Sequence, residues 1–172
     1  MDFRKLLETR YSVRNYLPKP IEPEKLETIL EAARLAPTAA NRQPQKIYVL
    51  QSDEAIAKVR SVTRMAFNAP VVLMVCYDET LSWKNTLQTF GEEYEGGEVD
   101  AAIVTSMMMM QATELGLGTL WVRGFDSRKL IEAFELSENI KPVCLMPLGY
   151  ANPETPRPVR PRKPVDEIMI SL

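Results

Sequence analysis

Apolar positions in the first half of the chain change their spacing from helical to strand-like. A period near 3.6 predicts a short helix behind Asp2 and a second, one-sided helix between Pro23 and Pro37. Continuous apolar runs at residues 46–50 and 71–77 predict two strands, with a third one-sided helix between them. This half of the chain therefore predicts helices that each bury one face against a core.

A longer helix is predicted at residues 98–115, and it carries four consecutive methionines, Met107 to Met110. Four consecutive apolar residues occupy all sides of a helix, so both faces of this one must be covered. We expect a partner subunit to supply the second cover, with one of Met108 and Met109 pointing at it. The alternative is a central helix that its own chain encases.

The rest of the pattern continues the alternation of strands and helices. Residues 119–122 predict a strand, Asp126 caps a helix after it, and residues 143–148 predict a buried strand that ends at Gly149. The acidic segment 78–98 predicts a loop or lid, and its aromatic residues are Trp83, Phe90 and Tyr94. Alternating strands and helices predict an α/β or α+β sandwich.

The composition changes after Tyr150. Residues 151–164 hold five prolines and four basic residues, which predict an extended arm, and residues 165–170 predict a short terminal strand. At polyproline rise the arm spans about 40 Å, whereas a compact chain of this length has a radius of gyration of about 16 Å. We therefore expect a domain at 1–150 and an arm at 151–172 that crosses to a second subunit. The alternative is an arm that embraces its own subunit.

The composition excludes several classes of function. The chain has no histidine, which removes Ser-His and Cys-His catalytic pairs and imidazole zinc sites, and we expect no metal site. Cys76 and Cys144 each lie in an apolar run, so they predict buried thiols in a reducing cytoplasm. The net charge of −2 recruits neither nucleic acid nor an anionic membrane, and no apolar stretch reaches the roughly 18 residues of a membrane span.

The segment after the first helix is the first candidate binding site. In an extended strand alternate side chains share a face, so Arg10, Ser12 and Arg14 would place two guanidinium groups around one hydroxyl. Arginine donates bidentate, charge-assisted hydrogen bonds, which suit a phosphate dianion. Arg160 and Arg162 repeat this spacing in the arm, which favours a phosphate receptor over the alternative, a solvated polar edge.

The loop over residues 36–44 is the second candidate. Asn41 and Gln43 alternate in it, and a carboxamide places a donor beside an acceptor, which suits the mixed donor/acceptor edge of a heterocycle such as a flavin pyrimidine ring. The alternative is that both amides only hold the loop's own backbone. Gly116 and Gly118 follow a predicted helix and precede a strand, which does not fit a dinucleotide fingerprint, and we expect them to cap that helix.

Together these motifs resemble the nitroreductase family over nearly the whole chain. The resemblance is carried by Arg10-x-Ser12-x-Arg14, Pro37-Thr38-x-x-Asn41-x-Gln43-Pro44, Gly116-Leu117-Gly118-Thr119-x-Trp121, the Gly149-Tyr150 turn and Arg160-x-Arg162. It implies a three-layer α+β sandwich with a central, mostly antiparallel sheet between helices. It also implies a C-terminal strand that two subunits can exchange.

The resemblance further implies a homodimer with two FMN molecules at its interface, each touched by both subunits. The arginines and Ser12 would hold the phosphate, the 37–41 loop would reach the ring from the opposite subunit, and the backbone N–H of Arg123 would point at flavin N5. The Arg123 side chain and Gln45 depart from residues frequent in the family. The implied cofactor-binding residues are Arg10, Tyr11, Ser12, Arg14, Pro37, Thr38, Ala39, Asn41, Gln43, Trp121, Val122, Arg123, Gly124, Arg160 and Arg162.

The function that the resemblance implies is hydride transfer from NADH or NADPH through FMN to small electrophiles such as nitroaromatics or quinones, with ping-pong kinetics. The cofactor makes and breaks the bonds while the protein supplies orientation and charge, so the lack of histidine is no obstacle. One alternative is a flavin-binding or flavin-storage protein with little turnover. Another is an anion-binding dimer without flavin.

Overall fold

A four-stranded antiparallel sheet forms the centre of the fold in the computed structural model, which describes residues 2–86 and 93–172. Its strand order is β1-β2-β6-β5, and the bounds are Gln45–Leu50, Val71–Asp78, Ile140–Gly149 and Gly118–Thr119. The strand predicted at residues 119–122 is shorter than expected, since Val122 forms only an isolated bridge with Leu145. The mostly antiparallel sheet is as expected.

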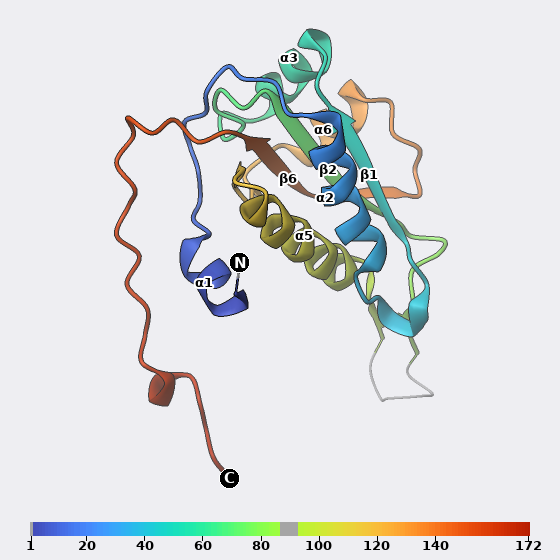
Figure 1. Ribbon diagram of the computed structural model, residues 1–172. Helices are drawn as coiled ribbons and strands as arrows, with labels where there is room; N and C mark the ends of the chain where they lie inside the picture. Colours follow the sequence, from blue (N-terminus) through green and yellow to red (C-terminus); the bar gives the residue numbers. More distant parts are fainter. Residues whose placement is uncertain (1, 87–92) are drawn as a thin grey trace.

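Helices cover both faces of this sheet, which makes three layers (Figure 1). The helices are α1 (Phe3–Thr9), α2 (Pro23–Leu35), α3 (Asp53–Val62), α5 (Gly97–Glu114) and α6 (Ser127–Ala133). One core cluster joins α2 and α5 to one face of the sheet, and a second joins α3 and α6 to the other face. The predicted α+β sandwich is therefore confirmed.

Strand β2 shows why this sheet produces continuous apolar runs. All eight of its residues are buried, and alternate side chains enter the two core clusters. Leu73 and Val75 pack on the α2/α5 side, whereas Val72 and Met74 pack on the α3/α6 side. A strand with helices on both faces has no solvent side, so no polar alternation appears in its sequence.

The burial of the α5 methionines differs from the expectation. Met108 and Met109 are both buried in the chain's own core, so the expectation that one of them faces a partner is wrong. Met107 is 44% exposed and faces outward, and Met110 is half-buried. The helix ends in a Schellman cap, in which Gly116 has φ +77° and Leu117 N–H donates to Ala112 O at 2.8 Å.

The segment predicted as a loop or lid contains a short hairpin. Its strands β3 (Lys84–Asn85) and β4 (Tyr94–Glu95) pair antiparallel, and the Trp83 and Tyr94 rings contact edge to face with centroids 5.7 Å apart. Phe90 lies outside the described residues. No helix within residues 2–86 and 93–172 is long and apolar enough to cross a membrane.

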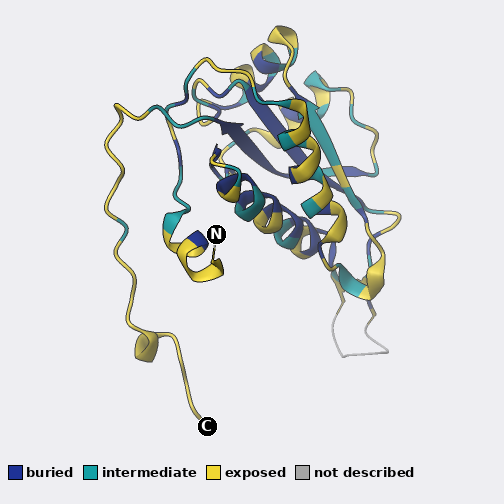
Figure 2. Ribbon diagram, in the orientation of Figure 1, coloured by how far each residue is buried: buried dark blue, intermediate teal, exposed yellow. Residues whose placement is uncertain are grey.

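The terminal arm runs away from the body of the fold and is exposed along most of its length (Figure 2). The strand predicted at residues 165–170 is wrong, because Val165–Glu167 forms the 3₁₀ helix η2 behind Pro164. A strand needs an edge with which to pair, and this stretch of the single chain reaches none. Its apolar side chains, including Ile168 at 72% and Ile170 at 85%, remain exposed.

Candidate functional site

The segment after α1 is extended, as predicted, and lies beside β5. Ser12 forms a parallel bridge with Thr119, and the Val13 N–H donates to Thr119 O at 3.0 Å. Val13 points inward against Gly118, where an added Cβ would come within 2.5 Å of its Cγ2, so only glycine fits there. Inward packing of Val13 leaves Ser12 and Arg14 on the other side, where the Arg14 guanidinium donates to Ser12 O at 3.3 Å.

The first part of the arm returns to this segment of its own chain. The Asn152 N–H donates to Asn15 O at 3.0 Å, which starts the arm beside the extended segment. Arg160 then donates to the carbonyl oxygens of Arg10 and Glu8, at the C-terminal end of α1. Residues 10–14 and 160, distant in sequence, therefore meet within one chain. This part of the arm follows the alternative, an arm that embraces its own subunit, and not the expected crossing to a second subunit.

Arg157 was not expected at this site. Its guanidinium donates to the carbonyl oxygens of Glu8 and Thr9 and stacks on the Tyr11 ring, 4.6 Å from the centroid. The stacking gives Tyr11 a role as a platform for the arm. Because Arg157 is three residues before Arg160, the motif spacing that revealed Arg160 and Arg162 passed over it.

The site contains a cluster of four arginines whose positive charges repel one another: Arg10, Arg157, Arg160 and Arg162. Burial lowers the pKa of Arg10, and the charges of Arg162 and Arg157 lower it further. Burial, together with Arg157, Arg10 and Arg162, also lowers the pKa of Arg160. No ion pair between described residues joins any of these arginines to a carboxylate. The cluster therefore holds concentrated positive charge that an anion would neutralise.

The loop of the second candidate site folds back on itself. Ala40, Asn41 and Gln43 have φ of 49°, 54° and 51°, a region that costs an L-residue about 1–2 kcal/mol. Inside the loop, Thr38 Oγ1 accepts from the Gln43 N–H at 3.0 Å, and the Gln43 amide donates to Asn41 O at 3.2 Å. The Gln43 carboxamide thus holds the loop's own backbone, which was the alternative interpretation, and the Asn41 carboxamide is exposed.

The structure keeps the two candidate sites apart. The loop meets α5 near its first turn, where Asp100 Oδ1 accepts from the Ala39 N–H at 2.8 Å, and Val13 packs on Gly118 beyond its last turn. At 1.5 Å per residue, Asp100 and Glu114 are separated by about 20 Å along the helix. Figure 1 shows the loop with the 3₁₀ helix η1 (Ala39–Asn41) at one end of α5 and the arginine-bearing segment at the other.

The backbone over residues 121–124, here called the 121–124 strip, contains four of the implied cofactor-binding residues and offers an unpaired backbone donor. Val122 N–H donates to Leu145 O at 2.9 Å, and Phe125 N–H donates to Arg123 O at 3.1 Å. For the Arg123 N–H, between them, the described residues provide no acceptor. The Arg123 side chain turns to α5, where its guanidinium lies 3.5 Å from a Glu98 oxygen, so the residue type that departs from the family pattern forms a surface ion pair.

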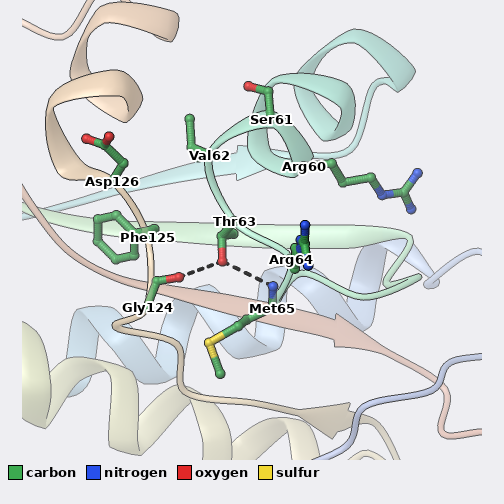
Figure 3. A pocket seen from close by; sticks show the side chains of 9 residues that line it. All are labelled: Arg60, Ser61, Val62, Thr63, Arg64, Met65, Gly124, Phe125 and Asp126. Carbon is green, nitrogen blue, oxygen red and sulfur yellow. Dashed lines mark hydrogen bonds between the residues drawn. The ribbon is translucent and has the colours of Figure 1, made fainter.

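A cavity of about 500 Å³ opens beside this strip (Figure 3). Thr63 Oγ1 donates to Gly124 O at 2.6 Å and accepts from the Met65 N–H at 3.1 Å, which joins the segment after α3 to the strip. An added Cβ on Gly124 would meet Met65 Sδ at 2.7 Å, so glycine permits this approach. The cavity is lined by Arg60, Ser61, Val62, Thr63, Arg64, Met65, Gly124, Phe125 and Asp126.

Arg64 and Met65 are cavity residues that the sequence did not reveal. They occupy a turn after α3 that has no apolar period and no recurring motif, so nothing in their spacing sets them apart. Among the described residues, no three cysteine or acidic side chains converge in a way that could hold a metal ion. The candidate site is thus made of cationic side chains, backbone N–H groups and apolar walls.

Comparison with known proteins agrees with this arrangement. The profile described as "Nitroreductase family" matches residues 7–68 and 62–150. A protein of Methanothermobacter thermautotrophicus, whose name proposes an NADH dehydrogenase/NAD(P)H nitroreductase, is 30% identical over 165 residues, 90% of this chain and 81% of the relative. The FMN reductase [NAD(P)H] of Bacillus subtilis is 28% identical over 95% of this chain and 71% of its own length.

Solved structures support the same assignment. A crystal structure of a nitroreductase family protein from Clostridium difficile 630 superposes with a TM-score of 0.88 at 38% identity, covering 99% of this chain and 98% of that one. The family profile spans both candidate sites apart from the arm. The chain therefore belongs to the nitroreductase family.

Proposed function

We propose that this protein is an FMN-containing oxidoreductase that takes hydride from NADH or NADPH and passes it to small electrophiles such as nitroaromatics or quinones. Family membership supports an NAD(P)H-dependent oxidoreductase, and a relative named FMN reductase [NAD(P)H] supports FMN as the cofactor. The resemblance to the family supports the proposed acceptor class, and ping-pong kinetics would follow from one ring face that serves both substrates in turn.

The observation that carries the proposal is the arginine cluster without carboxylate partners. Burial and, after it, mutual repulsion lower the pKa of Arg10 and Arg160, and a phosphate dianion among Arg10, Arg160 and Arg162 would offset that repulsion. Arginine keeps its proton and donates bidentate bonds, and the Ser12 hydroxyl adds a donor beside them. The chemistry of these groups fits the ribityl phosphate of FMN.

The ring end of the cofactor fits the strip beside the 500 Å³ cavity. The unpaired Arg123 N–H is a donor for an acceptor nitrogen, and Arg64 brings positive charge to the cavity wall that it shares with Gly124. When bound, FMN supplies the acceptance and donation of hydride. The chain's own residues orient the ring, hold one hydrogen bond and offset negative charge on the pyrimidine edge.

Completion of the site by a second copy of the chain explains why the loop and the arginines lie at opposite ends of α5. A groove between α1, α2 and α5 is suited to such a copy, because it is lined by Leu6, Leu35, Met107 and Met110. Leu35 is 67% exposed and Met107 is 44% exposed, so docking would bury apolar surface. The proposed unit is a homodimer with two equivalent sites.

The test begins with the absorption spectrum of purified protein saturated with FMN, followed by anaerobic titration with NADH and with NADPH. We expect loss of the flavin absorbance near neutral pH with one or both, and its return on addition of a quinone. Bound flavin that neither nucleotide reduces would contradict the oxidoreductase and favour storage. A protein that binds no FMN would exclude both and favour an anion-binding dimer.

A further inference from the structure

Asp100 is a buried carboxylate that contacts the loop over residues 38–43 from the first turns of α5. It is 2% exposed, and its Oδ1 accepts the hydrogen bond from the Ala39 N–H at 2.8 Å. Its Oδ2 is also buried, and no described residue donates to it. A neutral side chain could accept the same bond at lower cost, because an unpaired buried charge is more expensive than an unpaired neutral oxygen. The buried carboxylate therefore needs an explanation other than folding.

The loop needs an external restraint because its own hydrogen bonds do not fix its position. The bonds from Gln43 to Thr38 and Asn41 lie inside the loop and move with it. Three left-handed residues within four positions make this conformation unfavourable unless the surroundings enforce it. Among the described residues outside the loop, Asp100 is the one whose side chain forms a hydrogen bond with the backbone of residues 38–43.

The position of Asp100 on α5 suits this task. It is the fourth residue of an 18-residue helix, so the positive end of the helix dipole offsets its charge. A hydrogen bond to an ionised carboxylate is shorter and stronger than one to a neutral acceptor, which resists motion of the loop. The same helix ends beside the segment that bears Arg10 and Arg14, so one α5 supports the loop of one proposed site and the arginine segment of the other.

We infer that Asp100 is a positioning residue, which holds the 38–43 loop in the conformation that addresses the flavin ring. This inference rests on the proposed function for its role in catalysis, while the tether itself can be tested without cofactor. Among the described residues, the hydrogen bond of Asp100 goes to Ala39, and none joins it to the phosphate cluster or to residues 121–124. Its removal should therefore loosen the loop while the phosphate site stays intact.

The first measurement is tryptic cleavage of the apoprotein after Arg42, an exposed residue of the loop. We expect cleavage about tenfold faster or more in Asp100→Ala and an intermediate rate in Asp100→Asn, which keeps an oxygen for the Ala39 N–H but loses the charge. The matched control is Thr105→Val, a second buried polar residue of α5, because Thr105 donates to Ala101 O within the helix and not to the loop. Equal cleavage rates in Asp100→Ala and wild type would overturn the tether.

The second measurement compares turnover with FMN affinity. In Asp100→Ala we expect kcat/KM to fall about tenfold to a hundredfold while the Kd of FMN changes less than about threefold, with partial recovery of kcat/KM in Asp100→Asn. A parallel loss of FMN affinity, or full turnover despite a loosened loop, would overturn the positioning role. If wild-type protein binds or reduces no FMN, the proposed function fails, and the cleavage rates still decide whether Asp100 holds the loop.

Discussion

At the scale of single residues, the arginines of the site differ from those elsewhere on the surface. Arg34 pairs with Glu31 at 2.5 Å and Arg4 with Glu8 at 3.2 Å, both along one helix. Arg10 has no such carboxylate among the described residues, and its guanidinium is partly buried beside other guanidinium groups. An arginine that forms an ion pair with a carboxylate on a helix surface adds little stability. A cluster of arginines without such carboxylates can instead bind an anionic ligand.

The first prediction follows from this difference. Arg10→Ala should weaken FMN binding about tenfold to a hundredfold, because one charge-assisted contact contributes about 1.5–3 kcal/mol. Arg34→Ala, the matched control, should bind like wild type. Flavin fluorescence quenching measures the Kd in each case. An Arg10→Ala, Arg14→Ala double variant with wild-type affinity would remove the phosphate assignment.

Tyr150 forms a second residue-scale feature, at the junction between the domain and the arm. Its hydroxyl accepts from Lys25 Nζ and donates to Glu22 Oε2, each at 2.6 Å, and Lys19 Nζ lies 4.0 Å from the ring centroid. The bond from Tyr150 lowers the pKa of Glu22 to about 2, with further help from the two lysines. The cluster ties α2 to the start of the arm.

A pH dependence follows from the lowered pKa of Glu22. Its stabilisation is present above the unfolded pKa of about 4.5 and is lost as the pH falls toward about 2, since protonated Glu22 no longer accepts as a carboxylate. Tyr150→Phe should therefore lower the urea midpoint more at pH 7 than at pH 3. Urea titrations at both pH values measure this, and a difference that does not shrink at pH 3 would contradict it.

At the scale of elements, α5 is the helix on which the fold and the site both depend. Its inner face packs on the sheet, its first turn holds the loop, and its Schellman cap leads into Gly118 beside Val13. The outer face contributes Met107 and Met110 to the groove with α1 and α2. A helix used on every side explains why its apolar residues show no single stripe.

The two kinds of methionine in α5 should respond differently to substitution. Met107→Lys should leave a folded chain that sediments as a monomer, because Met107 is 44% exposed and lines the proposed contact. Met108→Lys should lower the thermal midpoint strongly, since its side chain is 0% exposed and a buried ammonium has no partner there. A dimeric Met107→Lys protein, or a wild type that is monomeric with FMN bound, would contradict the proposed interface.

Helices and strands with periodic apolar residues could be predicted from the sequence. Contacts between residues far apart in the chain could not. The apolar run of β2 and the cap at Gly116 follow from local rules, and both are confirmed. Asp100 and Arg157 lack any periodic signal, because their partners lie 61 and 148 residues away. The terminal strand failed for a related reason, since pairing depends on an edge that the local pattern does not specify.

At the scale of the whole molecule, the arm has two parts with different surroundings. Up to Arg160 it is bonded to residues 8–15 of its own chain, which is the geometry of an arm that embraces its own subunit. Beyond Pro161 every residue is exposed, and apolar side chains such as Ile168 and Ile170 have no cover. Only this last part is available to reach a second copy.

Two truncations separate these parts. A chain ending at Tyr150 should lose FMN and dissociate or aggregate, because it lacks Arg160, Arg162 and the terminal apolar residues. A chain ending at Pro164 keeps the arginines, so it should still bind FMN in concentrated solution. Its dimer should be weaker, with a higher dissociation constant than that of wild type. Sedimentation and flavin absorbance measure both. A yellow, dimeric 1–150 chain would remove the arm from the site and from the interface.

The separation of the loop and the arginine segment by the length of α5 has a genetic consequence. If each site takes its arginines from one chain and its loop from the other, defects in the two halves should complement each other. Arg10→Ala chains can be mixed with Asn41→Ala chains at an FMN concentration at which neither variant is active alone. The mixed dimers then have one site with both substitutions and one site with neither. After reassortment about a quarter of all sites should regain activity. Two alleles that each abolish function would then restore it in the same cell.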